Sequence, residues 1–184
     1  MLIVFGGLPG TGKSTISRLL AQRLKATYVR IDTIEQALRE CGTLPAGVVT
    51  EGYAVGCRVA EDSLRAGSSV VADSVNPIPE TRDAWIAVAH RAGVPVVEVE
   101  VVCSDTEEHR RRVETRISDV PGLTLPTWDA VQRRDYAPWD RPHVVLDTAS
   151  RTAEGTVAAL LETLPGGASP LERDPDLEPT HPGP

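Results

Sequence analysis

Lysine is nearly absent from this chain of 184 residues, which carries seventeen arginines and only two lysines, Lys13 and Lys25. Cysteine is also scarce, and Cys41, Cys57 and Cys103 lack the paired spacing of a disulfide framework or a zinc site. No apolar run reaches the roughly 18 residues of a membrane span. The apolar start lacks the basic segment of a signal peptide. We therefore expect a cytoplasmic protein with no membrane contact.

Acidic residues outnumber basic ones by 26 to 19, which gives a net charge of −7. The stretch 165–184 holds six of the fifteen prolines and four carboxylates against one arginine, so we predict a disordered acidic tail after a single domain over residues 1–164. The body remains acidic without this tail, which disfavours nucleic acid and anionic membranes as partners. The sequence does not set an oligomeric state.

Short apolar runs alternate along the chain with stretches of helical period. The runs that predict buried strands are Leu2–Phe5, Thr27–Ile31, Ser69–Ala72, Val94–Val102 and His143–Leu146. Strands that alternate with helices predict an α/β fold, here a parallel five-stranded sheet with helices on both faces. Ser104-Asp105-Thr106-Glu107 is typical of a capping box that opens a further helix.

The segment Gly7–Ser14 reads GLPGTGKS and matches G-x-x-x-x-G-K-[ST] at every fixed position, between a predicted strand and a predicted helix. Backbone N–H groups and the helix N-terminus face phosphate oxygens in such a loop. We expect ATP and Mg²⁺ to be bound by Gly10, Thr11, Gly12, Lys13 and Ser14. Lys13 would reach the β- and γ-phosphates, and the Ser14 hydroxyl would ligate Mg²⁺. The motif predicts a P-loop NTPase fold, without choosing between kinase, GTPase and motor ATPase.

Two aspartates follow the second and third predicted strands, where the strand ends of a parallel sheet meet beside the phosphate loop. Asp32 could accept or orient the proton of an attacking hydroxyl, and could also cap the helix predicted over Thr33–Arg39. Asp73 could hold Mg²⁺ through water or bind the acceptor, against a simple turn role. A base near the phosphate loop favours a kinase over a hydrolase.

The predicted helix after Ser104 carries Arg110, Arg111, Arg112 and Arg116. Arg112 and Arg116 are four residues apart and so share one face of a helix. We assign both to a helical lid that neutralises the transferring phosphoryl group. A solvated basic face paired with neighbouring glutamates is the alternative, and we prefer it for Arg110 and Arg111.

These features together resemble the small P-loop kinases, nucleoside-monophosphate-kinase-like in fold, that include chloramphenicol phosphotransferase, zeta-type toxins and the polynucleotide 5′-hydroxyl kinase domain, a group of AAA_33-like ATP-binding proteins. The similarity spans about residues 2–164. It implies that Thr15 joins Lys13 and Ser14 on phosphate and metal, that Asp32 is the hydroxyl's base, and that Arg116 contacts the transferring phosphate. It also implies that Thr148–Ser150 lie at the adenine.

Glu35 departs from two members of this group. Polynucleotide kinases and zeta-type toxins place an arginine there, three residues after the catalytic aspartate, whereas this chain has a carboxylate. A carboxylate beside the acceptor disfavours an acceptor that carries phosphate. We therefore expect Asp32, Glu35 and Asp73 to face the acceptor, with Glu51, Tyr53 and Arg58 as further candidates. The leading hypothesis is a kinase that phosphorylates a small-molecule hydroxyl, an antibiotic or a metabolite. The alternatives are a polynucleotide or nucleotide 5′-hydroxyl kinase and a non-catalytic ATP-binding regulator.

Overall fold

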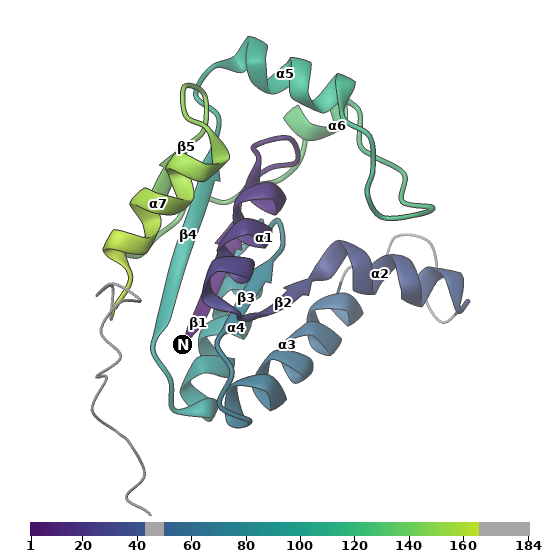
Figure 1. Cartoon of the computed structure of the whole chain (residues 1–184). Coiled ribbons are helices and arrows are strands. Elements are labelled where there is room, and N and C mark those ends of the chain that lie inside the picture. Colours follow the sequence, from purple (N-terminus) through teal and green to yellow (C-terminus); the bar gives the residue numbers. More distant parts are fainter. Residues whose placement is uncertain (43–49, 166–184) are drawn as a thin grey trace, which may run out of the picture.

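The computed structural model describes residues 1–42 and 50–165 and contains a parallel five-stranded sheet in the order β2-β3-β1-β4-β5 (Figure 1). The strands are β1 (Leu2–Gly6), β2 (Thr27–Arg30), β3 (Val70–Asp73), β4 (Val96–Val102) and β5 (Val144–Asp147). The helices are α1 (Lys13–Leu24), α2 (Ile31–Glu40), α3 (Thr50–Arg65), α4 (Pro79–Ala92), α5 (Thr106–Thr115), α6 (Trp128–Gln132) and α7 (Ala153–Thr163). The α/β prediction is confirmed. All but the first residue of the predicted tail lies outside the described residues.

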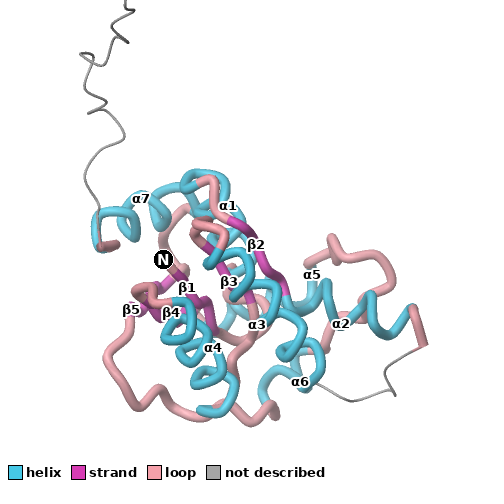
Figure 2. The backbone as a smooth tube through the Cα atoms, turned by 90° about the horizontal axis from the view of Figure 1, so that it is seen from below, coloured by secondary structure: helices cyan, strands magenta, loops and turns pink. Residues whose placement is uncertain are grey.

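The central strand β1 is buried on both faces, which explains its unbroken apolar sequence. Leu2 and Val4 join a core cluster with α3 and α4 on one face of the sheet. Ile3 and Phe5 join a second cluster with α1 and α7 on the other face (Figure 2). Helices α5 and α6 lie together beyond the carboxyl ends of the strands, in the position of a lid (Figure 1). None of the helices in the described part of the chain is long and apolar enough to span a membrane.

Three predicted boundaries are wrong in ways that affect the site. Residue 31 opens α2 instead of ending β2, so Asp32 lies in the first turn and does not cap the helix. The cap of α5 is Asp105, whose carboxylate accepts from the N–H groups of Glu107 and Glu108, and not Ser104. Helix α5 ends at Thr115, so Arg116 is its extended C-terminal neighbour and does not continue the helical face of Arg112.

Candidate active site

The phosphate loop joins β1 to α1, and its glycines have conformations that other residues avoid. Gly7 has φ +139° and Gly10 has φ +89°; a Cβ at Gly7 would lie 2.3 Å from the Val101 carbonyl oxygen. Lys13 is the first residue of α1 and is only 6% exposed. The loop and the start of α1 therefore form a fixed frame of N–H donors around a confined ammonium group.

A cavity of about 940 Å³ runs from this loop to α2. Its phosphate end is lined by loop and α1 residues, which include five of the predicted ones: Gly10, Gly12, Lys13, Ser14 and Thr15. Thr11 does not line it: its hydroxyl donates to the Leu8 carbonyl and its own carbonyl accepts from Thr148, so its side chain shapes the loop. The cavity's far end is lined by α2, Tyr53 and the segment 117–126.

Asp32 and Arg116 face the same cavity from α2 and from the end of α5. Burial lowers the pKa of Arg116 while the nearby Asp32 carboxylate favours its charged form. The Nε atom of Arg116 is buried and finds no hydrogen-bond acceptor among the described residues. Arg30 lies 3.9 Å from Asp32 and lines the cavity too. A carboxylate and a guanidinium thus line the same cavity beyond the phosphate loop.

Asp73 ends β3 and is 1% exposed. The Tyr28 hydroxyl donates to its Oδ2 atom over 2.6 Å, and Arg30 lies 3.7 Å from the same oxygen. Burial, with Asp73 next, raises the pKa of Tyr28. Asp73 is not among the residues that line the cavity, although its Oδ1 atom has no hydrogen-bond partner in the described chain. One carboxylate oxygen is therefore occupied, and the other is buried without a partner in the described chain.

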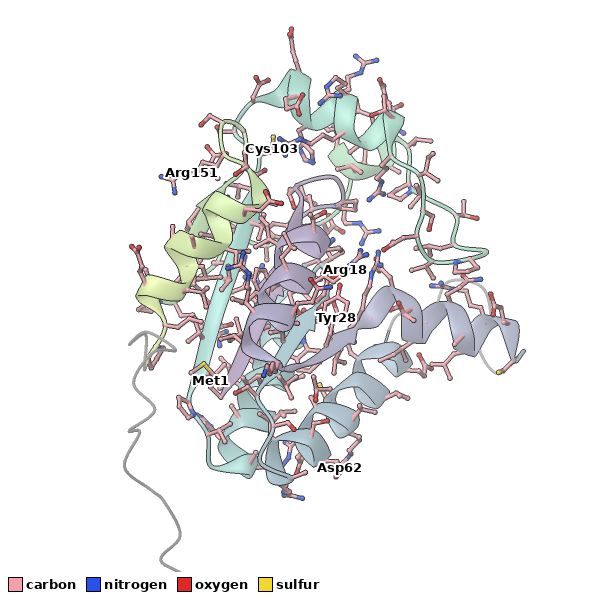
Figure 3. The ribbon with its side chains drawn as sticks, viewed as in Figure 1. Met1, Arg18, Tyr28, Asp62, Cys103 and Arg151 are labelled. Carbon is pink, nitrogen blue, oxygen red and sulfur yellow. The ribbon has the colours of Figure 1, made fainter. Side chains whose placement is uncertain are left out.

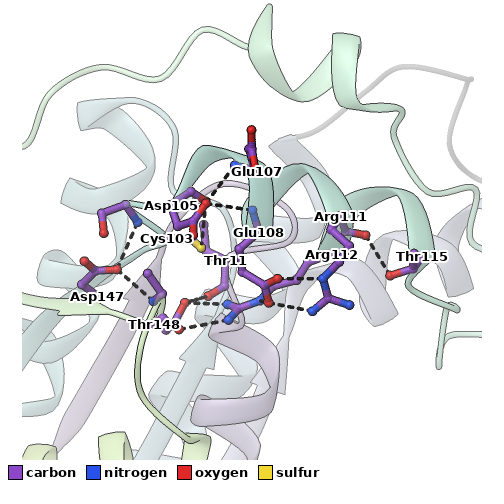
Figure 4. Close-up of polar contacts among 12 residues, drawn as sticks. Thr11, Cys103, Asp105, Glu107, Glu108, Arg111, Arg112, Thr115, Asp147 and Thr148 are labelled. Carbon is purple, nitrogen blue, oxygen red and sulfur yellow. Dashed lines mark hydrogen bonds and ion pairs between the residues drawn. The ribbon is translucent and has the colours of Figure 1, made fainter.

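All three guanidinium nitrogens of Arg112 have hydrogen-bond partners, whereas the Nε atom of Arg116 has none in the described chain. The Arg112 guanidinium binds Glu108 and donates to the hydroxyl and carbonyl oxygens of Thr148, over 2.8 and 3.0 Å (Figure 4). Arg111 and Arg112 together lower the pKa of Glu108 to about 2. A second hollow of about 230 Å³ adjoins Arg112 and Thr148, and Arg151 and Thr156 line it from the start of α7. Arg110 and Arg111 pair with Glu114 and Glu108 at the surface, as predicted.

Glu35 projects into the far end of the cavity and is 8% exposed. Arg39 donates to its Oε2 atom over 3.0 Å, and Gly52 of α3 packs so closely that a Cβ would overlap the Glu35 side chain. Burial raises the pKa of Glu35 despite the neighbouring Arg39. Of the further candidates Glu51, Tyr53 and Arg58, the described lining includes Tyr53 alone.

Comparison with known proteins shows the family to which the chain belongs. A family profile described as an AAA domain, AAA_33, matches residues 2–137. The chain belongs to this family of small P-loop kinases. It is 28% identical over 167 residues to the "Probable adenylyl-sulfate kinase" of Aeropyrum pernix, covering 84% of this chain and 86% of that one.

Solved structures agree with this AAA_33 assignment at the level of fold. A provisionally named kinase of Chloroflexus aurantiacus superposes with a TM-score of 0.70 at 19% identity and covers 91% of this chain and 97% of that one. The Mycobacterium tuberculosis APS kinase CysC, in complex with AMPPNP and APS, superposes with a TM-score of 0.60 at 21% identity. The match covers 88% of this chain and 95% of that one. The P-loop kinase fold is thereby established.

Arg82 holds the loop after β3 in this AAA_33 chain and was not expected to have a role in the site. It is fully buried, donates to the carbonyl oxygens of Asn76, Pro77, Ala137 and Pro138, and packs on the ring of Trp139. Asn76, at φ +50°, donates from its side chain to the Phe5 carbonyl. These contacts fix Val75 and Pro77 in the cavity wall, and the Val75 carbonyl accepts from the Gly7 N–H.

Asp119 ties the segment between α5 and α6 to the body of the AAA_33 domain. Its carboxylate accepts from Arg18 on α1 and from Arg30 at the end of β2. Both arginines lower its pKa, Arg30 more strongly, although burial opposes them. Arg18 lies on the side of α1 that faces α2, beside the cavity (Figure 3). The sequence indicated only a loop here, because nothing local shows which distant arginines a loop aspartate will meet.

Proposed function

We propose that this protein is a kinase that transfers the γ-phosphoryl group of Mg·ATP to a hydroxyl group of a small molecule. The observation that carries the proposal is that Asp32 and Arg116 line the same cavity that starts at the phosphate loop, close enough for the carboxylate to favour the charged guanidinium. Family membership and the similarity to the Aeropyrum pernix protein support the same reaction class. A nucleotide-binding regulator would have no need of a carboxylate and a free guanidinium at this point.

The reaction follows from the placement of these groups. Asp32 accepts the proton of the acceptor hydroxyl as its oxygen bonds to the γ-phosphorus, while the bond from that phosphorus to the β–γ bridging oxygen breaks and ADP leaves. Lys13 and Arg116 stabilise the charge that is spread over the transferring group. Arg116 suits this role because no described residue already occupies its Nε atom.

The residues present also fit a Mg²⁺ ion. A metal bound with the nucleotide would be held by its phosphates and the Ser14 hydroxyl, with Asp73 reached through water, since the Oδ1 atom of Asp73 is unpartnered in the described chain. The described residues contain no group of three acidic, cysteine or histidine side chains that could hold a metal alone. The ion would neutralise charge on the β- and γ-phosphates.

The far end of the cavity is lined by both apolar and polar side chains. Its walls come from α2, from the loop after β3, from α3, from the segment between α5 and α6 and from Arg134 after α6. Their apolar members include Val75, Pro77, Tyr53, Ile117, Leu123, Leu125 and Pro126, and their polar members include Glu35, Gln36, Arg39, Ser118, Asp119, Thr124 and Arg134. The Tyr53 hydroxyl already accepts from the Asn76 N–H, and Glu35 is bound to Arg39. An acceptor that combines an apolar body with a few polar groups would match this mixed lining, because each buried hydroxyl left unpaired against the apolar part costs about 1–3 kcal/mol.

An acceptor screen tests the proposal. The protein is incubated with γ-labelled ATP, Mg²⁺ and pooled compounds, and products that gain one phosphate are identified by mass. The pools contain aromatic and alicyclic alcohols, polyols such as gluconate, adenylyl sulfate and 5′-hydroxyl oligonucleotides. We expect transfer to a small-molecule alcohol that is lost in Asp32→Asn. Labelling of oligonucleotides alone, or ATP turnover that no pool increases, would contradict the proposal.

A further inference from the structure

His109 is a buried side chain in the lid that the reaction described above does not use. It lies on α5, is 7% exposed, and its Nε2 atom is 2.9 Å from the carbonyl oxygen of Pro9 in the phosphate loop. Its ring meets the edge of the Trp128 ring on α6, with centroids 5.2 Å apart and an angle of 82° between the planes. A carbonyl oxygen only accepts, so Nε2 carries the proton and donates.

The lid helix is seated on the phosphate loop at this point. A Cβ on Gly10 would lie 2.4 Å from Val113 and 3.2 Å from His109, both on the inner face of α5. Thr148 provides a second such hydrogen bond, since its hydroxyl donates to the Thr11 carbonyl over 2.8 Å (Figure 4). Two carbonyls of the loop are thus held from outside by side chains of distant segments.

Because a peptide unit is planar, a hydrogen bond that fixes a carbonyl group of the loop also fixes the direction of the next N–H group. The C=O of one residue and the N–H of the next point in opposite directions across a trans peptide, and no peptide bond of the described chain is cis. Holding the Pro9 carbonyl against His109 therefore turns the Gly10 N–H away from the lid helix. Gly10 lines the cavity, and its N–H donates to no other described residue.

We propose that His109 is a positioning residue that aims the Gly10 N–H at the β- and γ-phosphates of the nucleotide by holding the Pro9 carbonyl. Gly10 has no Cβ and an unusual φ, so its peptide planes lack the steric restraint that fixes other residues. A hydrogen bond from a buried ring supplies this restraint. Because the His109 ring also contacts Trp128, a nucleotide bound at the loop would change the environment of Trp128 on the second lid helix, α6.

The inference rests on the proposed function only in requiring a nucleotide on the loop, and binding can be measured without knowing the acceptor. The matched variants are His109→Gln, whose amide N–H can replace Nε2, and His109→Met, which is of similar size and has no hydrogen-bond donor. Affinities for Mg·ADP and for AMP are measured by calorimetry, with thermal melting of the nucleotide-free proteins alongside. AMP lacks the β-phosphate, so its affinity reports on general damage to the site.

We expect His109→Met to weaken Mg·ADP binding by about tenfold and to leave AMP binding within about twofold, because one hydrogen bond is lost. His109→Gln should stay within about threefold of the unmodified protein for both ligands. In the unmodified protein Mg·ADP should also change tryptophan fluorescence, and Trp128→Phe should remove most of that change.

Several results would overturn the inference: equal Mg·ADP affinity in the Gln and Met variants, an equal loss of AMP affinity, or a fluorescence response that survives Trp128→Phe. If His109→Met does not fold, the Gln variant decides, since a folded Gln variant with a tenfold loss is incompatible with a role for the donor. Failure of the unmodified protein to bind Mg·ADP would instead contradict the proposed function itself.

Discussion

The two ends of the cavity are built in opposite ways. The end proposed to hold the nucleotide comes mainly from one continuous segment, Gly7–Thr15, and offers backbone N–H groups and a single lysine. The end proposed to hold the acceptor comes from α2, from α3, from the loop after β3 and from the segment between α5 and α6, and offers mainly side chains. The geometry of a continuous motif is set by the backbone conformations of neighbouring residues. The geometry of a pocket built from distant segments depends instead on tertiary packing and on ion pairs such as those of Asp119.

This difference predicts unequal sensitivity to substitution. At the nucleotide end even conservative changes should be severe, because the frame is fixed and the lysine is confined. At the acceptor end, changes should alter turnover and selectivity while nucleotide binding persists.

Replacing Lys13 by arginine should lower phosphoryl transfer by about a thousandfold, although the charge is kept. Lys13 is 6% exposed, and the planar guanidinium fork of arginine cannot reproduce the position of a compact ammonium group on a flexible stem. Lys25→Arg is the matched control, because Lys25 is exposed at the C-terminal cap of α1 and should tolerate the exchange. Turnover is measured as ADP release with the acceptor found in the screen. Comparable activity in both variants would show that the Lys13 ammonium group is not required for phosphoryl transfer.

Asp32→Asn should lower kcat by roughly a hundredfold or more while the affinity for Mg·ATP stays within about twofold. The amide cannot take the proton of the acceptor hydroxyl but keeps the shape of the side chain. Asp62→Asn serves as control, since Asp62 lies exposed on α3, far from the lid (Figure 3). Single-turnover and binding measurements separate the two effects. A normal kcat in Asp32→Asn would rule out its role as base.

The same contrast explains what could be predicted from the sequence. The buried strands and the phosphate loop follow from local pattern and glycine chemistry, and both were predicted nearly residue by residue. Arg116 was expected to share a helical face with Arg112, but α5 ends one residue earlier. Arg112 binds Thr148, whereas the Nε atom of Arg116 has no partner in the described chain. His109 stands among arginines on a helix that looked solvated, and its spacing from Val113 was the one local sign of a buried face.

Convergent contacts could not be predicted because they depend on how distant segments pack. Arg82 looks like any surface arginine of an amphipathic helix until the segment that ends at Pro138 folds over it. Glu35 was identified by its departure from related kinases, but its burial against Gly52 and its bond to Arg39 come from the packing of α3 on α2.

Arg116→Gln should lower kcat by about a hundredfold with little change in the KM for ATP, because the proposed function places the Arg116 guanidinium against the transferring group. Arg112→Gln should mainly raise the KM for ATP, by about tenfold, since Arg112 braces Thr148 beside the smaller hollow. The two variants therefore test whether one lid arginine acts on turnover and the other on nucleotide affinity. Identical kinetic changes in both variants would show that the lid arginines act as one unit.

The smallest effect concerns Glu35 and the pH dependence of stability. Burial raises its pKa in the folded protein, so the folded state favours the neutral acid more than the unfolded state does. The free energy of unfolding should therefore fall as the pH rises from about 4, the ordinary glutamate range, through the raised folded pKa. Glu35→Gln cannot ionise and lacks this contribution. The stability of the unmodified protein relative to the variant, measured by urea unfolding at several pH values from about 4 to 7, should decrease with pH and then level off. An increase with pH would mean that Arg39 outweighs burial and that Glu35 is held as a carboxylate, ready to bind a donor group of the acceptor.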